Sequence, residues 1–320
     1  MQRIADLKPG EQVEGRFLVA RKELRQGGRA GFFLDLILCD PTGRVSAKVW
    51  ENARQLSEEF AQGDVVAVAG LAERFREEVQ VRVDDLRPVP PEEADPTEFL
   101  PRSAKDLDAL ERRLAEVVKS LANEHLRELL VAMFRDPEFR CRFRTAPGAK
   151  VLHHAYVGGL LEHTVEVVEI CLKVCDIFPA LDRDLLLAGA IVHDVGKLEE
   201  LTWTTAFDYT DEGNLLGHLV LGERMVRERA DRIEGFPEEL KLMLSHLILS
   251  HHGVAEFGSP KAPSTAEAIA LHHAEDLDAK VNMFLTEIGA ARDQGRRWTE
   301  RHFLLHRPLY AGDPEVVDED

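Results

Sequence analysis

The chain has 320 residues, of which 44% are hydrophobic and 31% are charged, and its formal net charge is −18. This length accommodates two domains of ordinary size, and the composition is that of a folded globular protein. The apolar runs fall short of the roughly 18 residues that a membrane-spanning helix needs, and the first residues lack the apolar core of a signal peptide. We therefore expect a cytoplasmic protein with no membrane contact.

The cysteines show no spacing that is typical of a disulfide framework or a zinc site. They are Cys39, Cys141, Cys171 and Cys175, and no CxxC motif occurs. Cysteines of this kind are usually reduced in a cytoplasmic protein. We expect no disulfide.

The negative charge is distributed unevenly along the chain. Residues 1–90 have a net charge of −1, so 91–320 carry the remaining −17. Four basic side chains gather in one short segment of the first part: Arg21, Lys22, Arg25 and Arg29. An acidic chain repels phosphates, but a local basic cluster can contact them. We take these four as candidate substrate-binding residues, with an ordinary solvated loop as the alternative.

The first part of the chain has the pattern of a small β-barrel. Residues 15–24, 31–40, 44–50, 64–70 and 78–86 are predicted strands, and 51–60 a short helix before the fourth strand. Three strands, a helix and two strands is the order of an OB-fold, which binds oligonucleotides across its second and third strands. We expect this domain to span 1–87, with the basic cluster at the loop that joins its first two strands. A barrel used only for protein contacts is the alternative.

The rest of the chain is predicted to be helical. Residues 88–102 are rich in proline and are interpreted as a linker, and 103–310 as an all-α domain followed by an acidic tail, 311–320. Helices are predicted over 103–134, 155–176, 182–195, 214–233, 237–251 and 264–290. The fold class is therefore multidomain, a five-stranded barrel followed by a helical domain.

Histidines are concentrated in the helical part, where all thirteen lie, twelve of them after residue 150. Four of them fall on, or at the end of, different predicted helices: His163, His193, His218 and His251. Asp194 adjoins one of these, and Asp278 lies on the last long helix. Helical bundles build metal sites from such inward side chains. The alternative is a set of histidines with only structural hydrogen bonds.

The residue types suit a divalent transition metal. Imidazoles and carboxylates favour Mn, Fe, Co, Ni or Zn, and an aspartate can bridge two ions with its two oxygens. Two such ions could activate a water molecule and neutralise the oxygens of a phosphodiester. Lys197, about one turn beyond His193, could contact a phosphate oxygen.

Several motifs resemble those of a known superfamily. "HDVGK" at 193–197, with "EHT" around His163, "NLLGHL", "LSHHG" and "EDLDAK", resembles the signature of HD-superfamily phosphohydrolases. Together with the predicted barrel and the closing "WTERHFLLHRPLY", the chain resembles YhaM-type 3′→5′ exoribonucleases, which join an OB-fold to an HD domain. The resemblance spans almost the whole chain.

The resemblance implies roles for individual residues. One metal ion would be bound by His163, His193, Asp194 and Asp278, and a second, bridged by Asp194, by His218 and His251. Asp194 and Lys197 would be catalytic, with Lys197 on the scissile phosphate. His154 would line the substrate channel or be structural. His252 is a neighbour that either replaces His251 or contacts substrate.

The resemblance also implies the activity and the partners. It predicts a hydrolase with two divalent ions, manganese foremost, that degrades single-stranded RNA, and possibly single-stranded DNA, to nucleoside monophosphates. It further implies a homo-oligomer. Two alternatives stay open: a phosphohydrolase of small or cyclic nucleotides, and a nucleic-acid-binding protein without catalysis.

Overall fold

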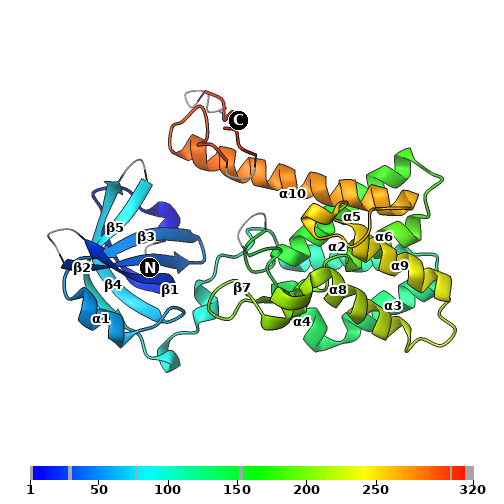
Figure 1. The fold of residues 1–320 in the computed structure, drawn as a ribbon, viewed down its shortest axis with the longest axis horizontal. Coiled ribbons are helices and arrows are strands. Elements are labelled where there is room, and N and C mark those ends of the chain that lie inside the picture. Colours follow the sequence, from blue (N-terminus) through cyan, green and yellow to red (C-terminus); the bar gives the residue numbers. More distant parts are fainter. Residues whose placement is uncertain (1–2, 28–30, 76–77, 151–153, 303–304, 314–320) are drawn as a thin grey trace. The chain divides into compact units, whose positions relative to one another are not determined.

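The computed structural model describes two compact units (Figure 1). The described residues are 3–27, 31–75, 78–150, 154–302 and 305–313. The first unit comprises Met1–Arg102 with Thr202–Asp208, and the second comprises Ser103–Leu201 with Tyr209–Asp320. The predicted fold class, a five-stranded barrel followed by a helical domain, is confirmed.

The first unit is a closed barrel in which the strands follow the order β1-β2-β3-β5-β4. Its elements are β1 (Gln12–Gly27), β2 (Gly31–Asp40), β3 (Gly43–Val49), α1 (Ala53–Glu59), β4 (Val65–Phe75) and β5 (Glu78–Pro88). All neighbouring strands are antiparallel except β3 and β5. This is the order of an OB-fold, so that β2 and β3 lie side by side on one face of the barrel.

The interior of the barrel is filled by alternate residues of its strands. Leu34, Leu36 and Leu38 of β2 are fully buried, and so is Val81 of β5. Alternation of this kind is what the period of a strand produces when one face lines the core. The alternating hydrophobic pattern of the sequence therefore predicts the strands of this unit correctly.

The proline-rich stretch after the barrel packs with the barrel unit. It forms two short 3-10 turns, η2 (Pro91–Glu93) and η3 (Pro96–Phe99). Phe99 and Leu100 are buried, and the Sγ atom of Cys39 donates a hydrogen bond to the carbonyl of Phe99 at 3.3 Å. The buried side chains tie this stretch to the first unit.

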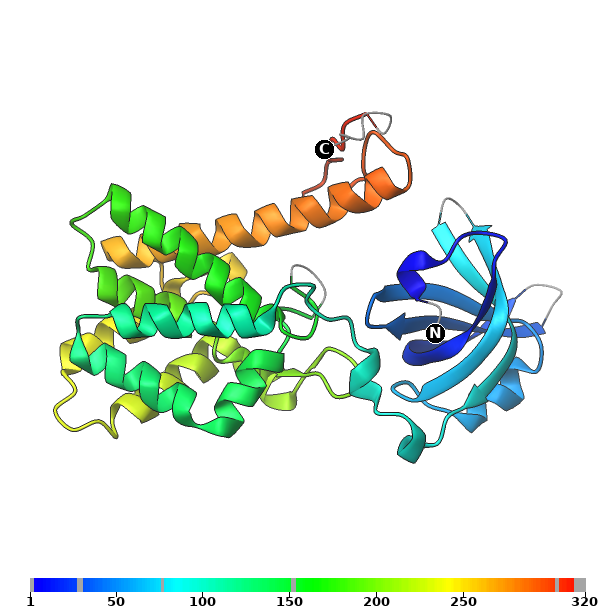
Figure 2. The same cartoon turned by 180° about the vertical axis from the view of Figure 1, so that it is seen from behind.

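The second unit is a bundle of helices (Figure 2). Its helices are α2 (Leu107–Ser120), α3 (Glu124–Arg135), α4 (Pro137–Thr145), α5 (Gly159–Ile177), α6 (Arg183–Val192), α7 (Lys197–Glu200), α8 (Asp211–Ala230), α9 (Glu238–Ser250) and α10 (Ala266–Asp293). The short strands β6 (Leu201–Thr202) and β7 (Asp208–Tyr209) pair with each other. None of the described helices has the length and apolar character needed to cross a membrane.

Helix capping explains where the structure departs from the predicted helices. The single helix expected over 103–134 is two helices, because the side chain of Asn123 accepts a hydrogen bond from the backbone N–H of Leu126 and starts α3. The sequence pattern did not predict α4, which Asp136 caps in the same way. The last helix, α10, is capped by Thr265, so it starts two residues after the predicted start at 264.

Candidate metal centre

The HDVGK segment forms the tight turn between α6 and α7. Helix α6 ends just before His193 and Asp194, and α7 begins just after Gly196. A Cβ atom on Gly196 would lie 1.9 Å from the carbonyl oxygen of His218, so only glycine lets this turn touch α8. The glycine of the motif therefore brings the third histidine to the His–Asp pair.

Two of the predicted ligands are held by backbone carbonyls. The Nδ1 atom of His193 lies 2.8 Å from the carbonyl of Ala190, and that of His251 lies 2.8 Å from the carbonyl of Ile248. A carbonyl only accepts hydrogen bonds, so Nδ1 carries the proton in each ring. In the neutral ring, the lone pair of Nε2 can then bind a metal ion.

The other two histidines are held by carboxylates. Nδ1 of His163 lies 2.6 Å from Oδ2 of Asp278, and Nδ1 of His218 lies 2.9 Å from Oε1 of Glu200. His218 follows Gly217, whose φ of +73° kinks α8 at this point, and its backbone N–H also donates to Glu200. Such outer hydrogen bonds are what orient metal-binding histidines in proteins.

All four Nε2 atoms surround the carboxylate of Asp194. His163 and His193 lie 3.5 and 3.4 Å from its Oδ2. On the other oxygen, Oδ1, His218 and His251 lie at 3.5 and 3.6 Å. Helices α5 and α8, the end of α9 and the α6–α7 turn each supply one imidazole to this arrangement. The structure therefore brings together His163, His193, Asp194, His218 and His251.

The cluster has the properties of a cation site. Among the described residues, Oδ1 of Asp194 and Nε2 of His218 and His251 are buried without a hydrogen-bond partner. Nε2 of His163 lies 3.2 Å from Nε2 of His193, a contact that needs a proton or a cation between two lone pairs. Buried polar atoms are costly when unpaired, so these residues fit one or more divalent ions.

Electrostatics keep the cluster ready to bind a cation. Burial opposes the charge of Asp194, but Lys197 and His193 more than offset it and hold the pKa of Asp194 well below its usual range. Burial lowers the pKa of His251 well below that of a free histidine, so this ring stays neutral. Burial opposes the charge of His193, but the charge of Asp194 more than offsets this and raises the pKa of His193, so a metal ion at this ring would displace a proton. An ionised carboxylate among imidazole nitrogens is the donor set that Zn, Mn or Fe prefers.

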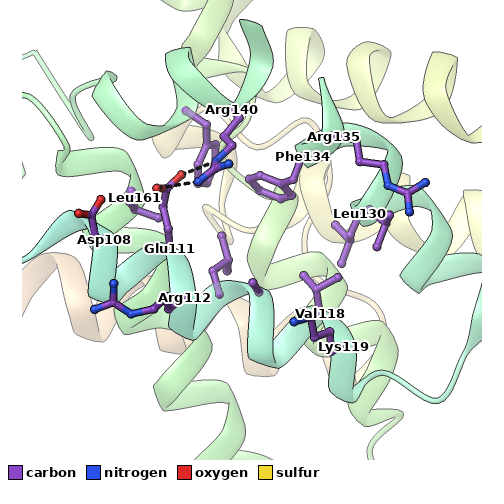
Figure 3. A pocket seen from close by; sticks show the side chains of 14 residues that line it. Asp108, Glu111, Arg112, Val118, Lys119, Leu130, Phe134, Arg135, Arg140 and Leu161 are labelled. Carbon is purple, nitrogen blue, oxygen red and sulfur yellow. Dashed lines mark hydrogen bonds and ion pairs between the residues drawn. The ribbon is translucent and has the colours of Figure 1, made fainter. Parts of the chain in front are cut away.

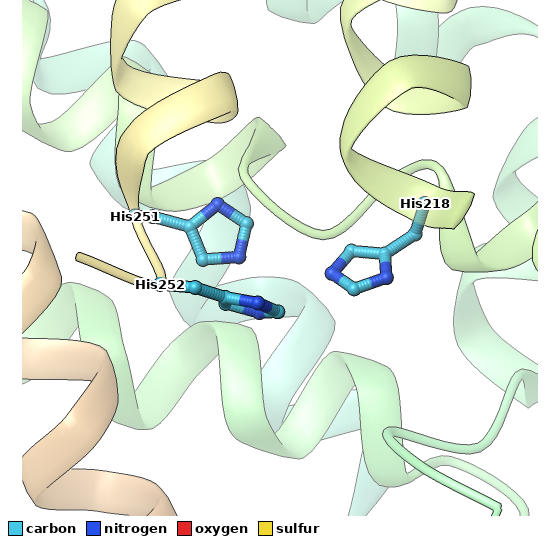
Figure 4. A group of neighbouring side chains, drawn as sticks. All are labelled: His218, His251 and His252. Atoms are coloured by element: carbon cyan, nitrogen blue, oxygen red, sulfur yellow. The ribbon is translucent and has the colours of Figure 1, made fainter. Parts of the chain in front are cut away.

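His252 lies beside the two histidines on the Oδ1 side of Asp194, His218 and His251. His218, His251 and His252 present ring nitrogens within 4.8 Å of one another (Figure 4). The rings of His251 and His252 lie 4.4 Å apart in an edge-on arrangement. The sequence left open which of these two histidines is a ligand, and the structure brings both to His218.

Asp278 does not join the four imidazoles around Asp194 directly. Its Oδ2 atom bonds to Nδ1 of His163, on the side of the ring that faces away from Asp194, and lies 3.2 Å from Nε2 of His154. His154 is itself buried, and its Nδ1 lies 2.9 Å from the hydroxyl of Tyr156. Asp278 therefore contacts the predicted ligand His163, and His154 contacts Asp278. His154 presents no exposed face to a substrate.

Two carboxylates at the cluster were missed by the sequence analysis. Glu200 orients His218, as described above. Glu275 lies one turn before Asp278 on α10, and its charge acts on His193 and Lys197. Burial, together with the charge of Asp194, raises the pKa of Glu275 to about 7. Its place within the "EDLDAK" segment was a usable signal, because three acidic residues occur there in four positions.

Lys197 is buried beside Asp194. Its Nζ atom lies 2.6 Å from Oδ2 of Asp194. Burial disfavours the ammonium ion, but the charge of Asp194 more than offsets this and raises the pKa of Lys197. The lysine is therefore a fixed positive charge at the cluster.

The basic residues predicted to bind substrate are partly paired within the barrel, where one carboxylate, Asp35, is shared with Lys48 as well. Arg25 and Arg21 lie 3.1 and 3.9 Å from the buried carboxylate of Asp35. Lys22 donates to the carbonyls of Ser57 and Phe60, which makes it part of the barrel's packing. Arg29 lies outside the described residues. The structure thus gathers Arg21 and Arg25 on one acidic partner and does not leave Lys22 for a ligand.

An aromatic pair lies on the same face of the barrel as Arg21 and Arg25 and was not predicted from the sequence. The rings of Phe33 on β2 and Trp50 after β3 are stacked, with centroids 4.8 Å apart. Trp50 is 45% exposed. Exposed aromatic rings on an OB-fold are surfaces on which bases can stack.

An apolar cavity in the helical unit lies apart from the cluster. It has a volume of about 500 Å³, is lined by residues of α2, α3, α4 and α5, and has a Glu111–Arg140 ion pair at its rim (Figure 3). None of the residues around Asp194 lines it. The candidate site is therefore defined by the histidines and not by this cavity.

Comparisons with known proteins agree with this arrangement. Residues 160–280 match the family model described as the HD domain, and 12–89 match that described as the OB-fold nucleic acid binding domain. Among solved structures, the chain is similar to the second OB-fold domain of replication protein A from Methanococcus maripaludis. The NMR structure of that domain is 20% identical and covers 28% of this chain and 93% of that chain, with a TM-score of 0.24. A crystal structure of a domain of the same protein gives the same identity and coverage and a TM-score of 0.23.

The fold and the site together define the class of protein. The chain joins an OB-fold nucleic-acid-binding domain to an HD domain. The HD domain indicates a metal-dependent phosphohydrolase, and its His–Asp clusters can hold divalent metal.

Proposed function

We propose that this protein hydrolyses single-stranded RNA, and also single-stranded DNA, in the 3′→5′ direction, and releases nucleoside monophosphates. The observation that carries the proposal is the set of four Nε2 atoms around the two oxygens of Asp194. The choice of RNA and the direction rest on the resemblance to YhaM-type exoribonucleases. The proposal includes self-association of the chain.

The cluster would hold two ions, with manganese as the first candidate. His163, His193 and Oδ2 of Asp194 would bind the first, and His218, His251 and Oδ1 of Asp194 the second. His252 would complete the second set. Paired divalent ions supply a water nucleophile at neutral pH and neutralise the oxygens of a phosphodiester.

The residues of the chain have three tasks in this proposal. Asp278 and Glu200 hold the protons of His163 and His218 at Nδ1, so that the Nε2 lone pairs face Asp194. Burial of the cluster excludes bulk water and strengthens its charges. Lys197 keeps Asp194 ionised and has further N–H donors for a non-bridging phosphate oxygen.

The barrel would supply affinity for a single strand. Stacking of bases on Trp50 and Phe33 is tolerant of sequence, as an exonuclease requires. Because Asp35 and Glu23 offset part of the charge of Arg21 and Arg25, stacking would supply part of the affinity beside the phosphate contacts. Binding should therefore depend less steeply on salt than that of a strongly basic OB-fold.

The test is degradation of 5′-labelled single-stranded RNA by the full chain with Mn²⁺. We expect a ladder that shortens from the 3′ end, and its loss in Asp194→Asn with a decrease in kcat of at least about a hundredfold. His273→Gln, which changes an exposed histidine of α10, is the matched control and should behave like the wild type. RNA hydrolysis by Asp194→Asn at the wild-type rate would refute the mechanism.

A second assay separates this proposal from a small-nucleotide phosphohydrolase. Cyclic dinucleotides and a chromogenic phosphodiester are offered at the same metal concentration as the RNA. The proposal expects a kcat/KM for RNA that exceeds both others. A chain that hydrolyses cyclic dinucleotides and leaves RNA intact would favour the alternative.

A further inference from the structure

The long helix α10 has an apolar face that no described part of its own unit covers. Leu277, Val281 and Leu285 are 51%, 46% and 62% exposed. Asp278, Ala274 and Leu271 of the same helix are buried. In Figures 1 and 2 the second half of α10 extends past the other helices of the bundle. The exposed face is therefore not the core-facing side of the helix.

The spacing of these residues is that of a helix that packs on another helix. Leu277, Val281, Phe284 and Ile288 follow one another in steps of four, three and four. Leu277 and Val281 are exposed, and Phe284 and Ile288 are half-buried. A repeat of 3.5 residues keeps one seam of a helix against a partner helix, as in a coiled coil. We call these four residues the α10 seam.

The seam is complementary to itself when a second copy runs antiparallel. In antiparallel pairs, residues of the a and d positions face each other, so Val281 would lie opposite Phe284 of the second copy. The same register places Leu277 opposite Ile288. Both layers share one two-fold axis, between Asn282 and Met283, as an isologous interface requires.

The charges beside the seam fit the same register. Lys280 and Glu287 both occupy the position just before an a residue, where antiparallel helices place one g side chain opposite another. Lys280 would then face Glu287 of the second copy, and the reverse pair follows by symmetry. Lys280 also pairs with Asp276 of its own helix at 2.7 Å, which leaves ammonium donors for a second partner.

An apolar groove widens the surface at one end of the seam. It has a volume of about 550 Å³ and is lined by Ala270, Ala274 and Leu277 of α10 together with Val174 and Phe178. Phe178 is 59% exposed. In the antiparallel register, the last turns of α10 from the second copy would lie over the part of this groove nearest Leu277 and Ala274.

We propose that the α10 seam is the interface of a homodimer, in which two copies of α10 pair antiparallel about a two-fold axis between Asn282 and Met283. The inference is independent of the proposed hydrolytic function, because it uses no residue of the metal centre.

Sedimentation velocity of the full chain over a range of concentrations tests the proposal. We expect a dimer for the wild type and a monomer for Val281→Asp. Thr286→Asp, which adds the same charge on another side of α10, is the matched control and should stay dimeric. Circular dichroism and thermal melting show whether each variant is folded, and a metal-content assay shows whether the centre is intact.

Charge reversal tests the register. Lys280→Glu and Glu287→Lys each place like charges opposite each other twice, so each alone should weaken dimerisation by about tenfold. The double variant Lys280→Glu with Glu287→Lys should recover the wild-type affinity, and so should an equimolar mixture of the two single variants.

Three results would overturn the proposal. The first is a wild-type chain that stays monomeric at the highest concentration tested. The second is a dimer that persists in folded Val281→Asp. The third is a dimer in which the mixture of single variants associates no better than either variant alone, which would contradict the antiparallel register.

Discussion

Oδ2 of Asp278 lies 2.6 Å from Nδ1 of His163, the ring nitrogen that faces away from Asp194. The resemblance to HD-superfamily proteins implies that Asp278 is a direct ligand of a metal ion. In the structure Asp278 accepts the Nδ1 proton of His163, and together with His154 and His163 it also forms a group whose ligand atoms could hold an ion. Asn282 fixes this carboxylate with a hydrogen bond of 3.0 Å to Oδ1.

We predict that Asp278→Asn weakens metal binding without abolishing it. An asparagine can still meet Nδ1 of His163 but no longer stabilises its proton as a charge does, and loss of such outer partners lowers metal affinity by about 10–100-fold. Titration with Mn²⁺ by calorimetry measures the change, with Asp293→Asn at the exposed end of α10 as control. A complete loss of the first ion, equal to that in Asp194→Asn, would instead make Asp278 a direct ligand.

The position of Glu275 predicts a pH dependence of the metal-free protein. Burial, with the charge of Asp194, raises the pKa of Glu275 to about 7 from its ordinary value of 4.5. The folded state thus binds a proton that the unfolded state has lost in this interval. The resulting stability is fully present below pH 4.5 and is lost as the pH rises to about 7, by at most about 3 kcal/mol.

Glu275→Gln isolates this contribution because glutamine stays neutral at every pH. In chelator, the free energy of unfolding of the variant should fall less than that of the wild type between pH 5 and 7.5, with about a 3 kcal/mol difference as the upper bound. Urea unfolding at each pH provides the measurement. Parallel curves for the two proteins would show that Glu275 does not titrate in this range.

The barrel and most helices follow from local patterns in the sequence, whereas some boundaries depend on caps. Alternation of Val79, Val81 and Val83 is sufficient to predict β5, since one face of a strand must line the core. The break between α2 and α3 depends on the Asn123 side chain turning back to its own backbone, and a continuous amphipathic pattern hides such a break.

The residue types of the metal centre could be predicted from the sequence, but the directions in which their side chains point could not. His163, His193, His218 and His251 lie on separate elements, and their convergence needs only that these elements pack together. Glu275 and Asp278 are three residues apart on one helix and differ by about 60° in direction, so the sequence alone does not decide which faces Asp194. Likewise, Asp35 meets Arg25 only through the pairing of β1 with β2.

Gly196 provides a prediction about the close contact between α7 and α8. In Gly196→Ala, the new Cβ would lie 1.9 Å from the carbonyl oxygen of His218 and 2.5 Å from the backbone nitrogen of Gly222, so α8 must move. We expect a loss of stability of at least about 3 kcal/mol and weaker binding at the His218 side of the cluster. Gly289→Ala, where a Cβ meets nothing within 4 Å in a helix, should instead stabilise by about 0.5–1 kcal/mol. Equal melting temperatures for the two variants would contradict the contact.

Trp50 allows the role of the barrel to be separated from that of the metal centre. Base stacking on an exposed aromatic ring contributes about 1–3 kcal/mol, so Trp50→Ala should raise the KM for single-stranded RNA by about 5–160-fold. Because Trp50 is not part of the Asp194 cluster, kcat and the hydrolysis of a chromogenic phosphodiester should be unchanged. Phe75→Ala, which removes another exposed ring of the barrel, is the matched control. A fall in chromogenic hydrolysis in Trp50→Ala would mean that the substitution disturbs the metal centre, and an unchanged KM for RNA would mean that the strand is held elsewhere.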